Sequence, residues 1–362
     1  MHCDTFRRAA HRLPTVASWS DRQKRCGRGN GKGRRPFGRA ISESGQLFVF
    51  GTMSRKPNLF LIGAMKSGTT YLRKLLQSHP DIFMCEPDEP SYFVEQRQLR
   101  AIWPDMWAHG LWRSEERYLA LFAAAGDAAI LGEASTNYAK RPLVLGVPER
   151  IHAFNPEARF VYLLRDPVER TISHYWHMVR HHAEHRPMLE AIRRDPQFVA
   201  VSHYAMQLMP FLERFGPDRI AVVTHERLIA DPTATMNMVY AWLGVDTAAA
   251  DRSGFAQAEN VAPDVVSVPR WLGVPRRMRQ SPALRTIMPR IPVTIHTALH
   301  RLTTTDIRRQ SVDVTETVAF LQSLQRRQTD DLMRLLGRTF PEWTTLNGEP
   351  GTPSRSAGSS AV

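Results

Sequence analysis

The sequence predicts an α/β fold in three layers, in which a parallel β-sheet carries helices on both faces. The main observation is that short apolar segments, typical of buried strands, alternate along the chain with longer segments of helical periodicity. The second is the composition: 43% of the 362 residues are hydrophobic and 23% are charged, as in globular proteins with a sizeable core. The whole pattern fits one folded domain over 55–346.

The alternation begins at 58–63, an apolar segment that is typical of a short strand. The segment 68–78 follows as a helix, because Leu72, Leu75 and Leu76 fall on one face of it. Further strands are expected at 82–84, 130–132, 159–164 and 219–224, and further helices at 143–154, 167–182, 232–243 and 315–336. In such sheets, ligands bind beyond the carboxyl ends of the strands. Residues that directly follow the strands are therefore the first candidates for a site.

Positive charge is concentrated in two stretches. Residues 1–52 contain eleven Lys or Arg and three Asp or Glu, so they carry +8 of the formal net charge of +13. The second stretch, 270–309, contains nine arginines and one acid. Basic surfaces attract phosphates, sulfates, nucleic acids or anionic membranes, and charge alone does not choose among these ligands.

Both ends of the chain are expected to be disordered. Residues 1–52 form a basic extension without apolar periodicity, and an incorrectly assigned start before Met53 is favoured over an Arg-rich transit peptide. Residues 347–362 form a tail rich in Gly, Pro and Ser. Neither segment is expected to contribute to the folded domain.

The sequence also favours a cytoplasmic protein. It contains no run of 18 apolar residues, so no transmembrane segment is expected, and no apolar segment near Met1 resembles a secretory signal. Three cysteines exclude a disulfide scaffold and a four-cysteine zinc site. The oligomeric state is left open by the sequence.

The first strand runs into a loop that predicts an anion site. The loop continues through Lys66-Ser67-Gly68-Thr69-Thr70 and opens the next helix. At a helix start, free backbone N–H groups and the positive end of the helix dipole point at the ligand. Thr69 and Thr70 add hydroxyl donors, and Lys66 adds a mobile positive charge. A turn that merely connects strand and helix is the structural alternative.

The spacing of this loop differs from that of nucleotide triphosphatases. In those proteins the lysine directly follows the second glycine, in the pattern GxxxxGK[ST]. Here Thr69 stands at that place, and the lysine is Lys66. The strand that ends at Leu164 is followed by Arg165 rather than by an acid that could hold Mg²⁺. Both observations count against ATP or GTP hydrolysis.

A second anion site is predicted where the strand 159–164 ends. Arg165 follows the strand directly, and Asp166, Pro167 and Glu169 match an N-cap, a proline at the first helical position and an acid in the first turn. Ser173 lies about two turns into the helix. Arg165 and Ser173 could both hold one phosphate, the arginine as a charged fork and the serine as a neutral donor. A capped surface helix with Arg165 in a salt bridge is the alternative.

Together the two segments resemble the sulfotransferases that use 3′-phosphoadenylyl sulfate (PAPS). The resemblance covers 57–245 well, and it implies a P-loop-like nucleotide site in which Lys66-Ser67-Gly68-Thr69-Thr70 binds the 5′-phosphosulfate. Arg165 and Ser173 then bind the 3′-phosphate. It further implies transfer of a sulfuryl group from PAPS to a hydroxyl or amine of a carbohydrate, lipid or small-molecule acceptor. Lys66 would neutralise the leaving oxygen, and no metal would be required.

The same resemblance suggests residues on the acceptor side. Glu89, in the segment Asp88-Glu89-Pro90, occupies the place of the family's general base, although the family often has Lys where Asp88 stands. A solvated acid is the alternative. Glu133, Ser135 and Tyr138 match an acceptor-side segment and are expected to line the acceptor pocket, with a structural loop as the alternative.

Other functions and sites are weaker candidates. Against a P-loop kinase-like phosphotransferase, the sequence has no lysine directly after the second glycine of the loop. Against a basic nucleic-acid-binding protein, it shows little interleaving of aromatic and basic residues. His177 and His181 are one helical turn apart, but no third metal ligand with a convincing spacing follows. The family's late basic loop over the nucleotide cannot be placed; its candidates are Asn260, Arg270, Arg276 and Arg277.

Overall fold

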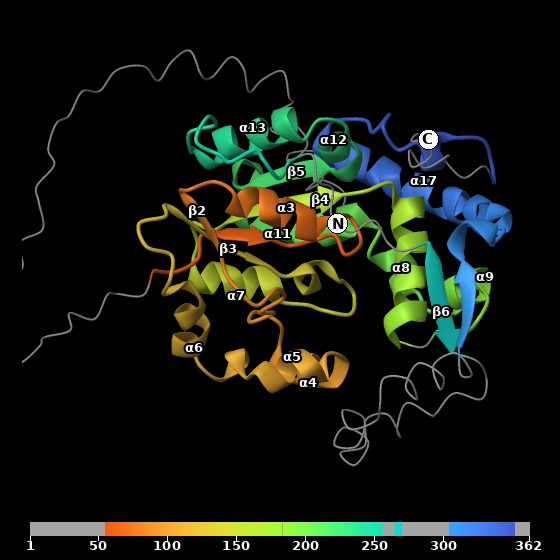
Figure 1. Ribbon diagram of the computed structural model, residues 1–362, viewed down its shortest axis with the longest axis horizontal. Coiled ribbons are helices and arrows are strands. Elements are labelled where there is room, and N and C mark those ends of the chain that lie inside the picture. Colours follow the sequence, from red (N-terminus) through yellow and green to blue (C-terminus); the bar gives the residue numbers. More distant parts are fainter. Residues whose placement is uncertain (1–54, 183, 256–263, 270–303, 352–362) are drawn as a thin grey trace, which may run out of the picture.

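A computed structural model describes residues 55–182, 184–255, 264–269 and 304–351. Its centre is a five-stranded parallel sheet with helices on both faces (Figure 1). The strands are β1 (Leu59–Leu61), β2 (Ile82–Met84), β3 (Ile130–Ala134), β4 (Arg159–Leu164) and β5 (Ile220–Thr224). Their order across the sheet is β2-β3-β1-β4-β5. The predicted α/β fold is confirmed.

Alternating side chains of the central strand face two different cores. Leu59 and Leu61 belong to one buried cluster, whereas Phe60 and Ile62 belong to the other, because successive side chains of a strand point to opposite faces. The first face is covered by α3 (Thr69–Gln77), α12 (His225–Ala230) and α13 (Pro232–Leu243). The second is covered mainly by α7 (Val147–Phe154), α8 (Pro167–His182), α11 (Tyr204–Phe215) and α17 (Thr315–Leu336).

Smaller elements surround this frame. Between β2 and β3 lie α4 (Gln96–Ile102), α5 (Pro104–His109), η3 (Leu111–Arg113), α6 (Glu115–Leu119) and η4 (Ala120–Phe122). The remaining short helices are η5 (Thr136–Ala139), α9 (Met188–Arg194), α10 (Gln197–Ala200), η6 (Pro217–Arg219), η8 (Arg309–Ser311) and α18 (Thr344–Asn347). β6 (Val265–Pro269) and β7 (Thr304–Arg308) form a separate antiparallel pair beside α8 (Figure 1). Within the described ranges, no helix is long and apolar enough to cross a bilayer.

Several predicted boundaries differ from the structure. β1 is Leu59–Leu61 rather than 58–63, and β3 extends through Ala134 rather than ending at 132. The helix expected from residue 143 begins at Val147, because Gly146 has a left-handed backbone (φ 76°) and Pro148 suits the first turn of a helix. Residues 347–351, which the sequence assigns to the tail, are described in the structure: the Gly351 N–H donates to the Gln322 side chain at 3.0 Å, against α17. Residues 1–54 and 352–362, including most of the expected disordered ends, lie outside the described residues.

Candidate active site

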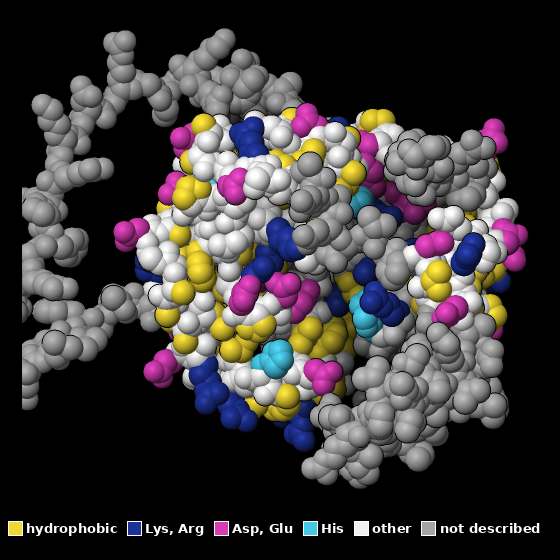
Figure 2. Space-filling model, viewed as in Figure 1, with side chains coloured by type: hydrophobic (Ala, Val, Ile, Leu, Met, Phe, Trp, Pro, Cys, Tyr) yellow, Lys and Arg dark blue, Asp and Glu magenta, His cyan; other side chains and the backbone are white. Residues whose placement is uncertain are grey.

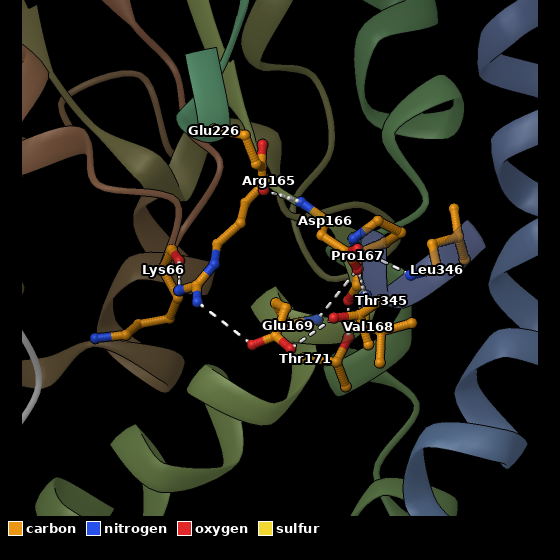
Figure 3. A network of polar contacts seen from close by, with 10 residues as sticks. All are labelled: Lys66, Arg165, Asp166, Pro167, Val168, Glu169, Thr171, Glu226, Thr345 and Leu346. Carbon is orange, nitrogen blue, oxygen red and sulfur yellow. Dashed lines mark hydrogen bonds and ion pairs between the residues drawn. The ribbon is translucent and has the colours of Figure 1, made fainter. Parts of the chain in front are cut away.

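The two anion-binding motifs leave the sheet at the same edge. β1 pairs in parallel with β4, so the loop after β1 and the turn after β4 are neighbours. The N–H of Ala64 donates to the carbonyl of Leu163 at 2.7 Å, which ties the loop to β4. From the end of β4, the Arg165 side chain extends toward the loop and donates to the Lys66 carbonyl at 3.4 Å (Figure 3). The structure therefore brings the two motifs together.

The loop after β1 has the features of an anion site. Gly68 adopts a left-handed backbone and precedes α3, and no described side chain caps this helix. The Ser67 hydroxyl is buried and has no hydrogen-bond partner among the described residues. Thr69 is half-buried and Thr70 is exposed. Uncapped amides at a helix start and an unsatisfied buried hydroxyl are both donors that a phosphate or sulfate group would satisfy.

We expect Gly68→Ala to abolish anion binding at this loop. An alanine Cβ at this position would lie 2.8 Å from Nδ1 of His225, and the φ of 94° is strained for any other residue. Gly244→Ala is the matched control, because Gly244 has a similar φ of 77° but no atom within 4 Å of an added Cβ. Calorimetric titration with adenosine 3′,5′-bisphosphate checks the difference. Equal binding by both variants would contradict the role of the loop.

Positive charges converge on Lys66. Burial lowers the pKa of its ammonium, and the surrounding arginines Arg165, Arg309, Arg180 and Arg170 lower it further in that order. On the face in Figure 2, which is viewed as in Figure 1, Lys, Arg and His side chains gather beside α8. Like charges that lower one another's pKa repel, so a bound anion with several negative charges would relieve the repulsion.

Ser173 of α8 and Arg165 after β4 are the two residues expected to hold one phosphate. Ser173 is buried on α8, three residues after Arg170, so the two side chains share one face of the helix. The Arg170 guanidinium donates to the Met65 carbonyl at 3.5 Å, so this face of α8 is turned toward the loop. Arg165 also pairs with Glu169 at 3.6 Å. Arg165 thus contacts the loop directly, whereas Ser173 shares a helix face with Arg170, which contacts the loop.

Arg170 is a fully buried cation in this site. Burial lowers its pKa to about 10. Its hydrogen-bond partners in the described residues are all uncharged: the hydroxyls of Thr171 and Ser202, the carbonyls of Met65 and Phe198, and the ring of His174. A buried charge held by dipoles alone keeps most of its field. Arg170 therefore adds a fixed positive potential beneath the loop.

The C-terminal segment braces the turn that carries Arg165. The Leu346 N–H donates to the Asp166 carboxylate at 2.9 Å, and the Thr345 hydroxyl donates to Glu169 at 2.8 Å (Figure 3). Asp166 itself caps α8 by accepting from the N–H of Val168 at 3.0 Å. Glu169 thus touches both Arg165 and the C-terminal segment.

Glu89 lies in a loop that packs against the end of β3. Its N–H donates to the Ala134 carbonyl at 2.9 Å, and its Oε1 accepts from the Thr136 hydroxyl at 2.6 Å. Its Oε2 is buried without a partner within the described residues. Burial raises the pKa of this carboxyl, and the positive charge of Lys140 is the largest opposing influence. An unsatisfied carboxylate oxygen with a raised pKa has the properties of a general base.

The Lys66 loop and the Glu89 loop both contain strained backbone. In the described ranges, the residues other than glycine with positive φ are Lys66, at 70°, Glu89, at 58°, and Ser91, at 52°. Such conformations cost roughly 1–3 kcal/mol each and persist where the surroundings hold them in place. Both proposed catalytic side chains therefore stand on backbone whose conformation the fold imposes.

Glu133, Ser135 and Tyr138 do not line an open pocket as expected. Their exposed fractions are 0%, 0% and 2%. The Ser135 hydroxyl accepts from the N–H of Ser91 at 3.0 Å, and the Tyr138 hydroxyl accepts from the N–H of Phe93 at 3.3 Å. The Glu133 carboxylate accepts a hydrogen bond from the Tyr118 hydroxyl. Burial raises the pKa of Glu133 to about 7. In this structure these side chains support the Glu89 loop from inside the protein, and their contact with an acceptor stays a prediction.

The structure adds residues that sequence reasoning missed. Arg309, directly after β7, lies over the Trp176 ring at 5.6 Å, and its Nε is buried without a partner among the described residues. It lies inside the basic stretch 270–309, so composition gave a weak signal. Lys140 and His225 had no such signal, since their positions depend on packing. The four candidates for a late basic loop, Asn260, Arg270, Arg276 and Arg277, lie outside the described residues.

The described residues contain no cluster of three potential metal ligands. The rings of His177 and His181 lie 4.6 Å apart, as their spacing on α8 predicts. That no metal is required stays a prediction.

Comparisons with known proteins point to one family. The model of the sulfotransferase family matches residues 57–249. Human heparan sulfate glucosamine 3-O-sulfotransferase 6 is 26% identical over 236 residues, which are 60% of this chain and 63% of that protein. The human bifunctional heparan sulfate N-deacetylase/N-sulfotransferase 3 is 26% identical over 210 residues, 54% of this chain and 23% of that protein. The chain thus spans less than two thirds of either relative.

A solved structure shares the fold. A sulfotransferase from Alicyclobacillus acidocaldarius superimposes with a TM-score of 0.55 and 24% identity, covering 80% of this chain and 99% of that one. The family match covers more than half of the chain, and it includes both the Lys66 loop and the Arg165 turn. The protein therefore belongs to the sulfotransferase family.

Proposed function

We propose that the protein transfers a sulfuryl group from PAPS to a hydroxyl group of a carbohydrate acceptor. The observation that carries the proposal is the convergence of the Lys66 loop and the Arg165 turn on adjacent strands, joined by the contact of 3.4 Å between Arg165 and the Lys66 carbonyl. The distance between the two phosphate-bearing ends of one adenosine nucleotide requires two separate anion sites on one edge of the sheet. The two turns are the candidates for these sites.

The residues at the site fit the donor. The buried Ser67 hydroxyl and the uncapped start of α3 would hold the 5′-phosphosulfate, while Arg165 and Ser173 would hold the 3′-phosphate. PAPS, when bound, supplies the sulfuryl group and a phosphate leaving group. Lys66 has the charge to neutralise the leaving oxygen as it becomes negative. Arg309 and Arg170 add positive potential around the same region.

The transfer itself needs a base on the acceptor side. In an in-line transfer, the acceptor oxygen forms a bond to sulfur while the bond between sulfur and the 5′-phosphate oxygen breaks, and the electron pair of that bond leaves with the phosphate. The acceptor proton passes to Oε2 of Glu89, which is buried and without a partner within the described chain. Adenosine 3′,5′-bisphosphate and the sulfated acceptor are the products.

Relatives support the acceptor class. Those described above are named as sulfotransferases of heparan sulfate, which is a carbohydrate. The acceptor screen therefore starts with desulfated heparan chains and small glycosides, and it adds lipid and phenolic hydroxyls and amines as competing classes. Labelled sulfate from PAPS should appear on a carbohydrate. Labelling of a lipid or phenol alone would overturn the acceptor class, and turnover of ATP with Mg²⁺ in place of PAPS would overturn the reaction.

We expect Arg165→Met to weaken binding of adenosine 3′,5′-bisphosphate by about tenfold to a hundredfold, since a charge-assisted hydrogen bond to phosphate contributes roughly 1.5–3 kcal/mol. The affinity for adenosine 5′-phosphosulfate, which lacks the 3′-phosphate, should fall much less in this variant. Calorimetric titration of both nucleotides measures the difference. Arg214→Met, at an exposed position on α11, is the control. Equal losses for the two nucleotides would show that Arg165 does not hold the 3′-phosphate.

A further inference from the structure

Lys140 is a buried amine beside the proposed base, and the proposed function leaves it without a role. It directly follows η5, and its side chain is 8% exposed. The ammonium donates to the Asn137 side-chain oxygen at 2.6 Å and lies 4.9 Å from the centre of the Trp103 ring. Burying a lysine with neutral partners alone is unfavourable, because the charge loses its water. The position therefore calls for an electrostatic explanation.

Glu89 provides that explanation. A single short turn contacts both groups, since Thr136 donates to Glu89 at 2.6 Å and Asn137 accepts from Lys140. No hydrogen bond joins Glu89 directly to Lys140 in the described part of the chain, so the two charges act on each other through space. Each is the largest favourable influence on the charged form of the other. Burial nevertheless lowers the pKa of Lys140 to about 8.

Other charged groups face the pair from neighbouring elements. Glu133 of β3 lies close enough for Glu89 to raise its pKa. Arg170 of α8 lowers the pKa of Lys140, and His174 of α8 has a pKa lowered well below its usual value, so its ring is neutral near pH 7. Of these groups, Lys140 is the cation with the strongest influence on Glu89.

We propose that Lys140 is a positioning residue, whose buried ammonium keeps Glu89 in the carboxylate form that can accept the acceptor proton. Asn137 and Trp103 hold the ammonium in place. The proposal rests on the role of Glu89 in the proposed function. It explains how a carboxylate can stay ionised at a site with little water: an opposite charge nearby offsets the loss of hydration.

The test is the pH dependence of kcat/KM in Lys140→Met, which removes the charge and keeps the length of the side chain. Without the ammonium, Glu89 binds its proton more tightly, so activity should be lost at a higher pH on the acid side. We expect the acid limb, the part of the pH profile where activity falls toward low pH, to move up by about one pH unit or more. This corresponds to a tenfold or larger increase in the proton affinity of Glu89. Activity should recover as the pH rises, because Glu89 then ionises without help.

Two comparisons separate this role from a structural one. Lys56→Met is the matched control, because it removes an ammonium 4.5 Å from the Phe154 ring at an exposed position. This variant should keep the parent pH profile. Binding of adenosine 3′,5′-bisphosphate to Lys140→Met should equal that of the parent. A loss of activity that is equal at every pH would overturn the proposal, since a packing defect does not depend on protonation.

A second variant covers the case in which Lys140→Met does not fold. Asn137→Ala removes the amide that holds the ammonium and leaves the charge itself unchanged. A smaller shift of the acid limb in the same direction supports the proposal, and an unshifted limb overturns it. Glu89→Gln separates the two levels of inference. If that variant keeps its turnover, the assigned base is wrong; if it is inactive while the Lys140 variants keep the parent profile, only the role of Lys140 is wrong.

Discussion

The Glu89→Gln variant is expected to lose about 10²–10⁴-fold in kcat, the usual contribution of a general base. Glutamine keeps the size of the side chain and its hydrogen bond to Thr136, but its amide cannot accept the acceptor proton. The carboxyl has an Oε2 without a partner within the described residues, so little structure should depend on that atom. Steady-state transfer of labelled sulfate, with the acceptor found by the screen, measures the loss.

The neighbouring Glu86→Gln provides the control for this variant. Its side chain is 85% exposed, and it lies in the same loop at 3.7 Å from Arg73. We expect turnover close to that of the parent. Both variants should bind adenosine 3′,5′-bisphosphate normally, since neither residue belongs to the Lys66 loop or the Arg165 turn. Near-normal turnover by Glu89→Gln would exclude Glu89 as the base.

Lys66→Met should lower kcat by about 10²–10³-fold, the range seen when one preorganised group that stabilises developing charge is removed. The lysine charge acts most strongly when the leaving oxygen becomes negative, so kcat should fall more than the affinity for adenosine 3′,5′-bisphosphate. Methionine keeps the side-chain length and the same difficulty with the positive φ of 70°. Kinetics with labelled PAPS and calorimetry of the product nucleotide separate the two effects.

Lys74→Met is the matched control for Lys66→Met, because Lys74 is an exposed lysine of α3, the helix that follows the loop. Its kcat should match that of the parent. If Lys66→Met weakened nucleotide binding and left kcat unchanged, Lys66 would act in ground-state binding only.

The sheet was predictable because its strands are buried on both faces. Such strands consist of short apolar runs, and the segments at 59–61, 82–84 and 159–164 stand out in the sequence for this reason. β6 and β7 were missed, since an antiparallel pair joined by a long connection has no local pattern that links Val265–Pro269 to Thr304–Arg308. The short helices between β2 and β3 carry too few residues for a clear period.

The site was predictable only where it is contiguous in sequence. The Lys66 loop and the Arg165 turn each combine strand end, anion donors and helix start within a few residues. Which way a side chain faces is decided by packing, and Glu133 and Tyr138 show the consequence: they stand in a recognisable segment, yet they point into the protein. Lys140 and Arg309 acquire their surroundings from elements far away in the chain.

The contacts of Leu346 and Thr345 with the start of α8 bear on where this protein can be cut. The family match ends at residue 249, almost a hundred residues before the segment that braces Asp166 and Glu169. A shortened chain that stops at 249 would contain every motif of the nucleotide site and yet leave the Asp166 carboxylate and the buried end of α8 without their partners. Anyone who trims the protein for crystallisation or for a fusion should keep the chain through Gly351.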